Sequence, residues 1–374
     1  MNVIFTCGGT GGHINPAIAL ADLLRQRDPQ CNILFIGAKG RMEEKLVPQA
    51  GYEVVCLPSV SFTRGKNLKA LGKNLQGAVK IADALVKCKK VLKDFKPDVI
   101  VGTGGYASFP ALFLGSRMGI PTCVHEANAV PGLTTRLVAD RVDKVLVCFE
   151  ESARYYKHPE KVQVVGMPVR REFAETDPER ARMDLGLDSR PLIVSAFGSQ
   201  GAREMNKAVA EMFVLEAAAG MPYQHIHATG TYGWEWMPDY VRSLGVNPDA
   251  CEGLDMREYI YNMPVLMAAA DVIISRAGAS TLNEIGVSGT PCVIIPSPNV
   301  TDNHQEKNAR VLEKRGAALV LLEKEATGER LYREVSALLD DKYRRERMRE
   351  ALLDCVPADA ADRMVKLILE LAKK

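Results

Sequence analysis

The feature that most constrains this fold is a local pattern of apolar strand, glycine-rich turn and helix that occurs four times. It occupies residues 4–20, 99–114, 193–206 and 272–287; the first of these reads IFTCGGTGGHINPAIAL. Short strands that alternate with helices predict parallel sheets, because a parallel connection needs a crossover helix. The pattern therefore predicts an α/β protein with doubly wound sheets.

The apolar β-branched runs fall into two series, and 374 residues suit two domains. We predict domains at 1–166 and 167–357, with Gly166 and Pro168 at the joint, and one further amphipathic helix at 358–374. The first series of predicted strands is Asn2–Cys7, Asn32–Gly37, Val54–Leu57, Val99–Val101, Thr122–His125, Lys144–Val147 and Val162–Val165. The second is Leu192–Phe197, His225–Ala228, Cys251–Leu254, Val272–Ser275, Cys292–Ile295 and Ala318–Leu321.

The four glycine turns predict binding of phosphate or sugar oxygens. In an open α/β sheet such turns lie at the carboxyl ends of strands, and the amides that begin the next helix attract anions. A dinucleotide fingerprint fails, because a G-x-G-x-x-G that starts at Gly9 would end at Ile14, and Gly37 and Lys39 stand where an acidic residue is needed. No GK[ST] follows any of these glycines, so a P-loop is excluded as well.

Composition narrows the class of protein. The net charge of +2 argues against nucleic acid as a partner. Nine cysteines without a CxxC pair indicate reduced thiols and a cytoplasmic protein. No secretory apolar segment precedes the first predicted strand, and no run of eighteen apolar residues predicts a transmembrane helix. Any membrane contact is expected to be peripheral.

Six motifs stand in one order along nearly the whole chain: GGTGGH at 8–13, GTGGYASFP at 102–110, HEANAVPGLTTR at 125–136, GSQGAR at 198–203, SRAGASTLNEI at 275–285 and TDNHQEKNA at 301–309. Together they resemble the MurG-type N-acetylglucosaminyltransferase family of bacterial peptidoglycan synthesis. The resemblance implies a GT-B fold, with two Rossmann-like domains facing across a cleft and no cofactor. It further implies that the C-terminal helix at 358–374 returns to the N-terminal domain. It also implies inverting transfer of N-acetylglucosamine from UDP-N-acetylglucosamine to the muramoyl 4-hydroxyl of lipid I, which gives lipid II.

The segment RAGASTLNEIG is the expected donor anchor. Ser280 and Thr281 lie where a helix should begin, which brings hydroxyl and N–H groups to a diphosphate. Glu284 lies one turn later on the same face. Its carboxylate can accept hydrogen bonds from both ribose hydroxyls, which is the role that the resemblance implies for the matching family glutamate. The alternative is a solvated glutamate in a capping box with Thr281. No D-x-D motif occurs, so charge stabilisation by amides and a cation is favoured over a bound metal.

The resemblance assigns further donor contacts. Arg170 would complement the nucleotide charge, Ser199 would lie by the phosphates, and the backbone of Ile260 would read the uracil edge. Ala279 belongs to the same anchor as Ser280. Gln305 would contact the donor sugar, and His304 stands where the family commonly has glutamine, so this contact departs from the family pattern.

The first-domain loops are expected to hold the reacting groups. Thr10, Gly11 and Gly12 would fold around the donor sugar, and Gly104, Gly105 and Tyr106 around the acceptor diphosphate. His13 fits two roles, general base for the muramoyl hydroxyl or hydrogen-bond donor to a phosphate, with a histidine that caps its own helix as the alternative. By resemblance Asn128 positions the sugars. Glu126 is a second candidate base or a structural carboxylate bonded to loop amides.

One segment is strongly basic: residues 64–96 hold ten Lys or Arg and two acidic residues. Leucines recur there at helical spacing beside lysines, which suits the anionic inner leaflet of a cell membrane. The alternative is a helix packed on the sheet with a solvated lysine face. The residues expected at the membrane are Arg64, Lys66, Leu68, Lys69, Leu71, Lys73 and Leu75.

Three other functions are compatible with these motifs. A related GT-B transferase would use another sugar or lipid acceptor, a UDP-sugar epimerase would convert its donor without any acceptor, and a noncatalytic module would bind UDP without turnover. The resemblance favours UDP-N-acetylglucosamine, lipid I and the membrane surface as partners, together with proteins of cell-wall synthesis or division.

Overall fold

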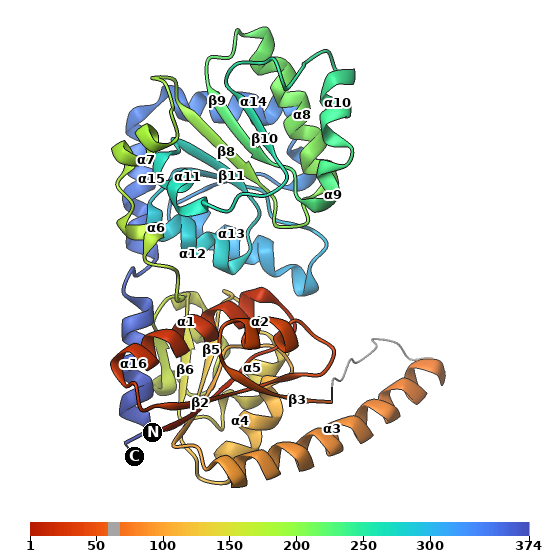
Figure 1. Cartoon of the computed structure of the whole chain (residues 1–374), viewed down its shortest axis with the longest axis vertical. Helices are drawn as coiled ribbons and strands as arrows, with labels where there is room; N and C mark the ends of the chain where they lie inside the picture. Colours follow the sequence, from red (N-terminus) through yellow and green to blue (C-terminus); the bar gives the residue numbers. More distant parts are fainter. Residues whose placement is uncertain (59–67, 374) are drawn as a thin grey trace. The chain divides into compact units, whose positions relative to one another are not determined.

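The computed structural model describes residues 1–58 and 68–373, and divides the chain into two compact units. Unit 1 comprises Met1–Val169 and Asp359–Lys374, and unit 2 comprises Arg170–Ala358. In Figure 1 the final blue helix therefore belongs with the red-to-yellow part of the chain.

Unit 1 contains a seven-stranded parallel sheet in the order β3-β2-β1-β4-β5-β6-β7. Its central strands β1, β4 and β5 are buried except for the first residue of β1, as expected for a sheet covered on both faces. The strands are β1 Asn2–Thr6, β2 Asn32–Ala38, β3 Glu53–Leu57, β4 Val99–Gly102, β5 Thr122–Glu126, β6 Lys144–Val147 and β7 Val162–Val164.

Helices cover both faces of this sheet, each with its own buried cluster. On one face α1, α2 and α16 contribute apolar side chains such as Leu20 and Ile368; on the other α3, α4 and α5 contribute Leu92 and Leu112. An ion pair between Arg27 and Asp362 also joins α1 to α16. The helices are α1 Gly11–Arg27, α2 Glu43–Gln49, α3 Leu68–Phe95, α4 Ser108–Arg117, α5 Leu133–Ala139, η1 Glu150–Tyr155, η2 Pro159–Lys161 and α16 Ala360–Leu371.

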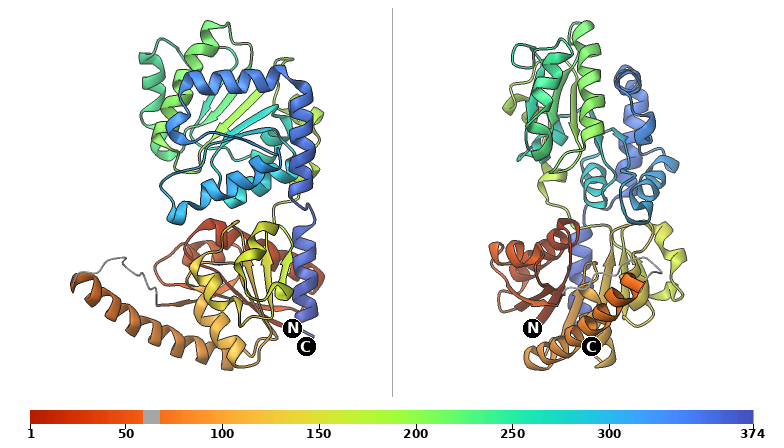
Figure 2. Two further views of the ribbon diagram at one scale, coloured as in Figure 1. Left: turned by 180° about the vertical axis from the view of Figure 1, so that it is seen from behind. Right: turned by 90° about the vertical axis from the view of Figure 1, so that its right-hand side faces the viewer.

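Unit 2 repeats the plan with a six-stranded parallel sheet in the order β10-β9-β8-β11-β12-β13. The strands are β8 Leu192–Ala196, β9 Gln224–Ala228, β10 Leu254–Arg257, β11 Val272–Ser275, β12 Cys292–Ile294 and β13 Leu319–Val320. Helix α8 packs on α14, and α12 packs on α6 and α15 (Figure 1, Figure 2). The helices are α6 Glu172–Glu175, α7 Pro178–Asp184, α8 Arg203–Ala218, α9 Thr231–Trp234, α10 Met237–Ser243, α11 Met263–Ala269, α12 Ala279–Ser288, η3 Thr301–Asn303, α13 His304–Lys314, η4 Glu323–Glu325, α14 Gly328–Asp340 and α15 Lys342–Cys355.

The predicted fold class, two doubly wound α/β sheets, is confirmed. One predicted strand is wrong: we expected Cys251–Leu254, whereas β10 runs from Leu254 to Arg257. This strand lies at the edge of its sheet, where only Leu254 is buried and Asp255 pairs with Arg257 at 2.6 Å. An edge strand with charged side chains carries little of the apolar signal by which a strand is recognised.

No helix within residues 1–58 and 68–373 is long and apolar enough to span a membrane.

Each sheet has one position where the strand order reverses, between β1 and β4 in unit 1 and between β8 and β11 in unit 2. Ligands of open α/β sheets bind outside the carboxyl ends of the strands at such positions. The four glycine-rich turns of the sequence follow these same four strands. The fold therefore gathers the glycine turns in pairs, one pair in each unit.

Candidate active site

In unit 1 the turns after β1 and β4 are in direct contact. A Cβ atom built at Gly105, where φ is +79°, would lie 2.2 Å from the carbonyl oxygen of Gly8, so only glycine fits. The Thr103 hydroxyl donates to the carbonyl oxygen of His13 at 2.7 Å, and the Ser108 hydroxyl lies 2.7 Å from the carbonyl oxygen of Gly104. The two predicted loops therefore form one structure, with Tyr106 half-buried beside them.

Helix α1 begins directly at the first glycine turn. Thr10 is its N-cap in an extended conformation, so Gly11, Gly12 and His13 form the first turn. The His13 amide donates to the carbonyl oxygen of Thr10 at 3.0 Å, whereas the amides of Gly11 and Gly12 precede the first hydrogen bond of the helix. The alternative in which His13 caps α1 is wrong, because the imidazole turns back to the carbonyl oxygen of Gly8, 2.8 Å from Nδ1. These amides provide an anion-binding helix start beside an imidazole.

The Gly8 contact fixes the protonation pattern of the His13 ring. A carbonyl oxygen only accepts hydrogen bonds, so Nδ1 carries the proton in the bond to Gly8. In the neutral ring Nε2 is then the atom with the free lone pair. The glycine at position 104 leaves room for that edge of the ring, because a Cβ there would lie 3.0 Å from Nε2 and 2.9 Å from Cδ2. His13 is therefore oriented to accept a proton at Nε2.

A buried carboxylate that the sequence did not reveal supports the same loop. Glu43, in the first turn of α2, is fully buried, and its Oε1 accepts a hydrogen bond from the Gly9 amide at 2.9 Å. Its side chain also packs on Gly37, where an added Cβ would lie 2.8 Å from the Cβ of Glu43. No motif marks this residue, because the contact joins the ends of β1 and β2 across a long stretch of sequence.

Glu126 is the last residue of β5, and Asn128 lies in the loop that follows. Glu126 is buried; its Oε1 accepts from the amide and side-chain nitrogens of Asn128 at 3.0 and 3.1 Å, and its Oε2 accepts from the Gly132 amide at 2.9 Å. Such a carboxylate shapes the loop and orients the carboxamide of Asn128. The neighbouring His125 is also buried, and desolvation lowers the pKa of its imidazole. The hydrogen bond from this ring to the carbonyl oxygen of Gly166, at 2.9 Å, opposes that change.

In unit 2 the turn after β11 leads into α12. Gly278 is the N-cap, so Ala279, Ser280 and Thr281 form the first turn, with hydroxyl groups beside unpaired amides. A capping box between Thr281 and Glu284 is therefore wrong, because Thr281 is not the N-cap residue. The first turn of α12 is instead a half-buried set of donors, suited to an anion.

Glu284 lies one turn further along α12 and is half-buried. Burial raises the pKa of its carboxyl group, and the positive charge of Arg170 opposes that rise. Arg170 itself is exposed, and its guanidinium lies 5.2 Å from the centre of the Phe173 ring. The two charges are thus close enough to interact without a direct ion pair in the described part of the chain.

The carboxamide of Gln305 joins two loops at the carboxyl edge of this sheet. Its Oε1 accepts from the Ala277 amide at 3.2 Å and from the Ser297 amide at 2.9 Å. Both acceptor positions are used, so the NH₂ group is the part left to donate to a ligand. The neighbouring His304 donates from Nδ1 to the carbonyl oxygen of Thr301 at 2.9 Å, which leaves Nε2 as its acceptor.

The two remaining residues expected to contact the sugar nucleotide, Ser199 and Ile260, follow strands β8 and β10. Ser199 is exposed, and its carbonyl oxygen accepts from the Thr231 amide at 3.1 Å. The Ile260 side chain is buried directly after β10, which leaves its backbone as the feature available to a ligand. Both residues thus present backbone at the carboxyl edge of the sheet.

The residues expected at the membrane lie in and just before helix α3. Arg64 and Lys66 lie outside the described residues. Leu68, Lys69, Leu71, Lys73 and Leu75 belong to the first half of α3, whose backbone is helical. Further along α3, Val79 and Val86 are exposed.

Comparison with known proteins agrees with this geometry. The glycosyltransferase family 28 N-terminal domain matches residues 3–147, and the family 28 C-terminal domain matches residues 192–364. The chain is 41% identical over 369 residues to the UDP-N-acetylglucosamine--N-acetylmuramyl-(pentapeptide) pyrophosphoryl-undecaprenol N-acetylglucosamine transferase of Thermoanaerobacter sp. (strain X514), covering 98% of this chain and 99% of the relative. It is 40% identical to the protein of that name from Desulfitobacterium hafniense (strain DSM 10664 / DCB-2), covering 100% of both chains.

Solved structures with the same fold include a MurG protein. The crystal structure of Acinetobacter baumannii MurG matches with a TM-score of 0.75 and 25% identity over 99% of each chain. The chain therefore belongs to glycosyltransferase family 28, in the MurG family of UDP-N-acetylglucosamine--N-acetylmuramyl-(pentapeptide) pyrophosphoryl-undecaprenol N-acetylglucosamine transferases.

Proposed function

We propose that this chain transfers N-acetylglucosamine from UDP-N-acetylglucosamine to the 4-hydroxyl of the muramoyl sugar of lipid I, with inversion, and so forms lipid II. The observation that carries the proposal is the orientation of His13. Its Nδ1 is held by the Gly8 carbonyl oxygen, and its Nε2 has no hydrogen-bond partner among the described residues and lies beside a glycine turn at the point where the strand order of unit 1 reverses. That arrangement supplies a base where an acceptor hydroxyl can be bound.

The proposed reaction is a single displacement. Nε2 of His13 takes the proton of the muramoyl 4-hydroxyl while the oxygen attacks C1 of N-acetylglucosamine from the face opposite UDP. The bond between C1 and the diphosphate oxygen breaks, and its electron pair leaves with UDP. One displacement at C1 inverts the configuration. A general base in such a step contributes about 10²–10⁴-fold to the rate.

The donor would bind to unit 2. We assign the diphosphate to the first turn of α12, where Ala279, Ser280 and Thr281 offer amides and hydroxyls. Arg170 and Ser199 would add a positive charge and a hydroxyl group to this site. These groups stabilise the charge that gathers on the leaving UDP. Glu284 would accept from the two ribose hydroxyls, and the backbone of Ile260 would contact the uracil.

The sugars would be recognised by carboxamides and by the first glycine turn. The free NH₂ of Gln305 supports a contact to the donor sugar, and His304 supports one through Nε2. On unit 1, Thr10, Gly11 and Gly12 would approach the donor sugar, and Asn128, oriented by Glu126, would position the reacting sugars. Gly104, Gly105 and Tyr106 would hold the acceptor diphosphate.

We also propose that the chain works at the cytoplasmic face of the cell membrane as a peripheral protein, because its acceptor is a lipid. The basic segment at 64–96 supports this, with roughly 1 kcal/mol gained per basic residue near an anionic surface. The exposed Val79 and Val86 lie two helical turns apart on α3, on one face, and extend the apolar side of that segment. Proteins of cell-wall synthesis or division are proposed partners.

Product analysis tests the proposed reaction. UDP-N-acetylglucosamine labelled in the sugar is incubated with a short-chain lipid I analogue, and the linkage and anomeric configuration of the product are determined by NMR. We expect a β1,4-linked disaccharide that forms only when the acceptor is present. Donor conversion without acceptor would identify an epimerase, and UDP binding without any turnover would identify a noncatalytic module; either result would reject the proposal.

A further inference from the structure

Arg276 stands at the start of the segment RAGASTLNEIG, directly after β11, and its guanidinium reaches three other segments at the carboxyl edge of the sheet. Nη1 donates to the carbonyl oxygen of Ile295, after β12, at 3.2 Å, and Nη2 donates to the Glu323 carboxylate, after β13. The guanidinium also lies 5.8 Å from the centre of the Phe197 ring, after β8. One side chain thus connects the segments that follow β8, β11, β12 and β13, which are neighbours in the sheet.

The ion pair between Arg276 and Glu323 is largely shielded from water. The two side chains are 13% and 19% exposed, whereas those of the Arg180–Asp184 pair on α7 are 80% and 64% exposed. Exposed pairs contribute little to stability, but removal of one partner from a shielded pair leaves a charge without compensation. The contact between Arg276 and Glu323 therefore constrains the two segments that carry it.

The two loops that Arg276 joins are the loops that the Gln305 carboxamide bridges. Ala277, whose amide donates to Oε1 of Gln305 at 3.2 Å, directly follows Arg276. Ser297, whose amide donates to the same oxygen at 2.9 Å, lies two residues after Ile295. Both amides orient the carboxamide, so the direction of its NH₂ group changes when either loop moves. Arg276 thus lies directly behind the group proposed to contact the donor sugar.

The loop after β12 borders open space on one side. A cavity of about 480 Å³ lies beside it, and the residues around this cavity include Pro296, Pro298, Asn303, Glu306 and Glu323. Pro298 is exposed. Because apolar packing does not cover this side, the loop depends on polar contacts, of which Arg276 and Gln305 supply two.

Helix α12, which carries the proposed diphosphate site, is held in a different way. It packs on α6 and α15, and within its first turns the Asn283 side chain donates to the carbonyl oxygen of Ala279 at 2.8 Å. Neighbouring helices thus set the position of α12, whereas side-chain hydrogen bonds set the position of the loop after β12. Loss of the Glu323 carboxylate is therefore expected to disturb the sugar contact and to spare the nucleotide contacts.

We propose that Arg276 and Glu323 are positioning residues for recognition of the donor sugar, an inference that rests on the proposed function. Their ion pair holds the loops after β11 and β12 at the separation that the Gln305 carboxamide bridges, so the NH₂ group is oriented before the donor binds. A group oriented in advance loses less entropy when the ligand arrives. The pair thus contributes to affinity for the sugar and leaves affinity for UDP to other residues.

Calorimetric titrations of the full chain with UDP-N-acetylglucosamine and with UDP test the proposal. Both titrations omit the acceptor, so the result does not depend on which lipid accepts the sugar. Glu323→Ala removes the carboxylate, and Glu325→Ala is the matched control, because Glu325 is exposed on the same short helix η4. Melting temperatures establish that each variant is folded.

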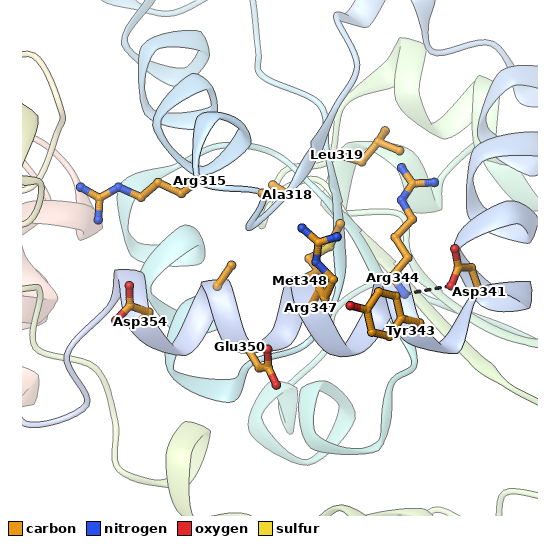
Figure 3. Close-up of a pocket in the computed structure, with 12 residues that line it drawn as sticks. Arg315, Ala318, Leu319, Asp341, Tyr343, Arg344, Arg347, Met348, Glu350 and Asp354 are labelled. Atoms are coloured by element: carbon orange, nitrogen blue, oxygen red, sulfur yellow. Dashed lines mark hydrogen bonds between the residues drawn. The ribbon is translucent and has the colours of Figure 1, made fainter.

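A second variant changes the other partner. Arg276→Lys keeps the positive charge but loses the fork of donors that reaches Ile295 and Glu323 together. Arg344→Lys is its control: Arg344 is exposed on α15, and Figure 3 shows it around the same pocket as Leu319, the first residue of β13. All strands of this sheet are parallel, so the control residue lies at the amino edge, opposite the edge that carries Gln305.

We expect the Kd of UDP-N-acetylglucosamine to rise about tenfold in Glu323→Ala and in Arg276→Lys, while the Kd of UDP stays at the wild-type value and both controls bind both ligands like the wild type. Wild-type affinity of the two variants for UDP-N-acetylglucosamine would overturn the proposal. Equal weakening of both ligands would also overturn it, because the pair would then support the unit as a whole. A wild-type chain that binds UDP but not UDP-N-acetylglucosamine would reject the proposed donor, and this inference with it.

Discussion

The Nδ1 atom of His13 lies 2.8 Å from the carbonyl oxygen of Gly8, and this contact decides which imidazole nitrogen is free to take a proton. The other side of the ring lies against Gly104, where any larger residue would crowd it. The orientation of the proposed base thus depends on two glycine turns that follow neighbouring strands, β1 and β4.

Replacing Gly104 by alanine should move the His13 ring. A Cβ at this position lies 2.9 Å from Cδ2 of the ring, and φ is +104°, so both crowding and backbone strain result. We expect kcat to fall by about 10²-fold, the effect of an ångström-scale displacement of a reacting group. Gly40→Ala is the matched control, because φ is +72° there with open space around the Cβ.

The control should lose about 1 kcal/mol of stability and keep its kcat. Steady-state kinetics and thermal melting of both variants make the comparison. Equal losses of kcat in Gly104→Ala and Gly40→Ala would contradict the crowding of His13.

Removing the Glu43 carboxylate should loosen the first glycine turn. Glu43→Ala deletes the bond to the Gly9 amide and opens space beside Gly37, so we expect a loss of about 1–3 kcal/mol in the free energy of unfolding, with a lower kcat. Glu44→Ala changes the exposed neighbour on the same helix and should leave both quantities unchanged. Denaturant melts and transfer rates test this. If Glu43→Ala matches Glu44→Ala, the carboxylate does not support the loop.

The carboxyl of Glu284 should make stability depend on pH. Burial raises its pKa in the folded chain, so the folded state holds a proton that the unfolded state has released. The contribution to stability is therefore present below the unfolded pKa and is lost as pH rises through the folded pKa. Glu284→Gln should remove this dependence and be more stable than the wild type at neutral pH.

The same substitution should weaken donor binding, because a carboxamide accepts fewer ribose hydroxyl bonds than a carboxylate. Urea melts over a pH series and UDP titrations measure both effects, with the exposed Glu329→Gln as control. A Glu284→Gln protein that binds UDP like the wild type would remove Glu284 from the donor site.

The two ends of the Gln305 carboxamide should be separable by mutation. Gln305→Glu keeps the oxygen that accepts from Ala277 and Ser297 but loses the NH₂ group, so we expect a nearly unchanged melting temperature and a higher KM for the donor. Gln305→Ala loses both functions and should also cost about 0.5–1.5 kcal/mol for each lost bond. An unchanged donor KM in Gln305→Glu would show that the NH₂ group does not contact the sugar.

Much of the fold was accessible from sequence because its strands are buried. Strands such as β4 and β11 are buried along their whole length and lead into a glycine-containing turn, so their apolar runs stand out. Edge strand β10 lacked that signal and was misplaced. The glycine turns were recognisable for a related reason: a backbone that must approach a neighbour as closely as Gly105 approaches Gly8 admits one residue type.

The parts that sequence did not reveal are contacts between distant segments. Nothing in the sequence near Glu43 indicates that its carboxylate reaches Gly9, and the bridge from Gln305 to Ala277 depends on loops that follow different strands. Likewise the Nδ1 contact of His13 needs the path of the turn, which glycine leaves undetermined because it permits many backbone conformations. Residue types predicted the chemistry, and tertiary contacts set its geometry.

The most direct measurement is acceptor-dependent transfer of labelled N-acetylglucosamine to a lipid I analogue by the wild type and by His13→Ala, with donor saturating. If Nε2 of His13 is the base, kcat falls by about 10²–10⁴-fold while UDP affinity, measured separately, changes little. A His13→Ala enzyme with wild-type kcat would contradict the account and direct attention to Glu126.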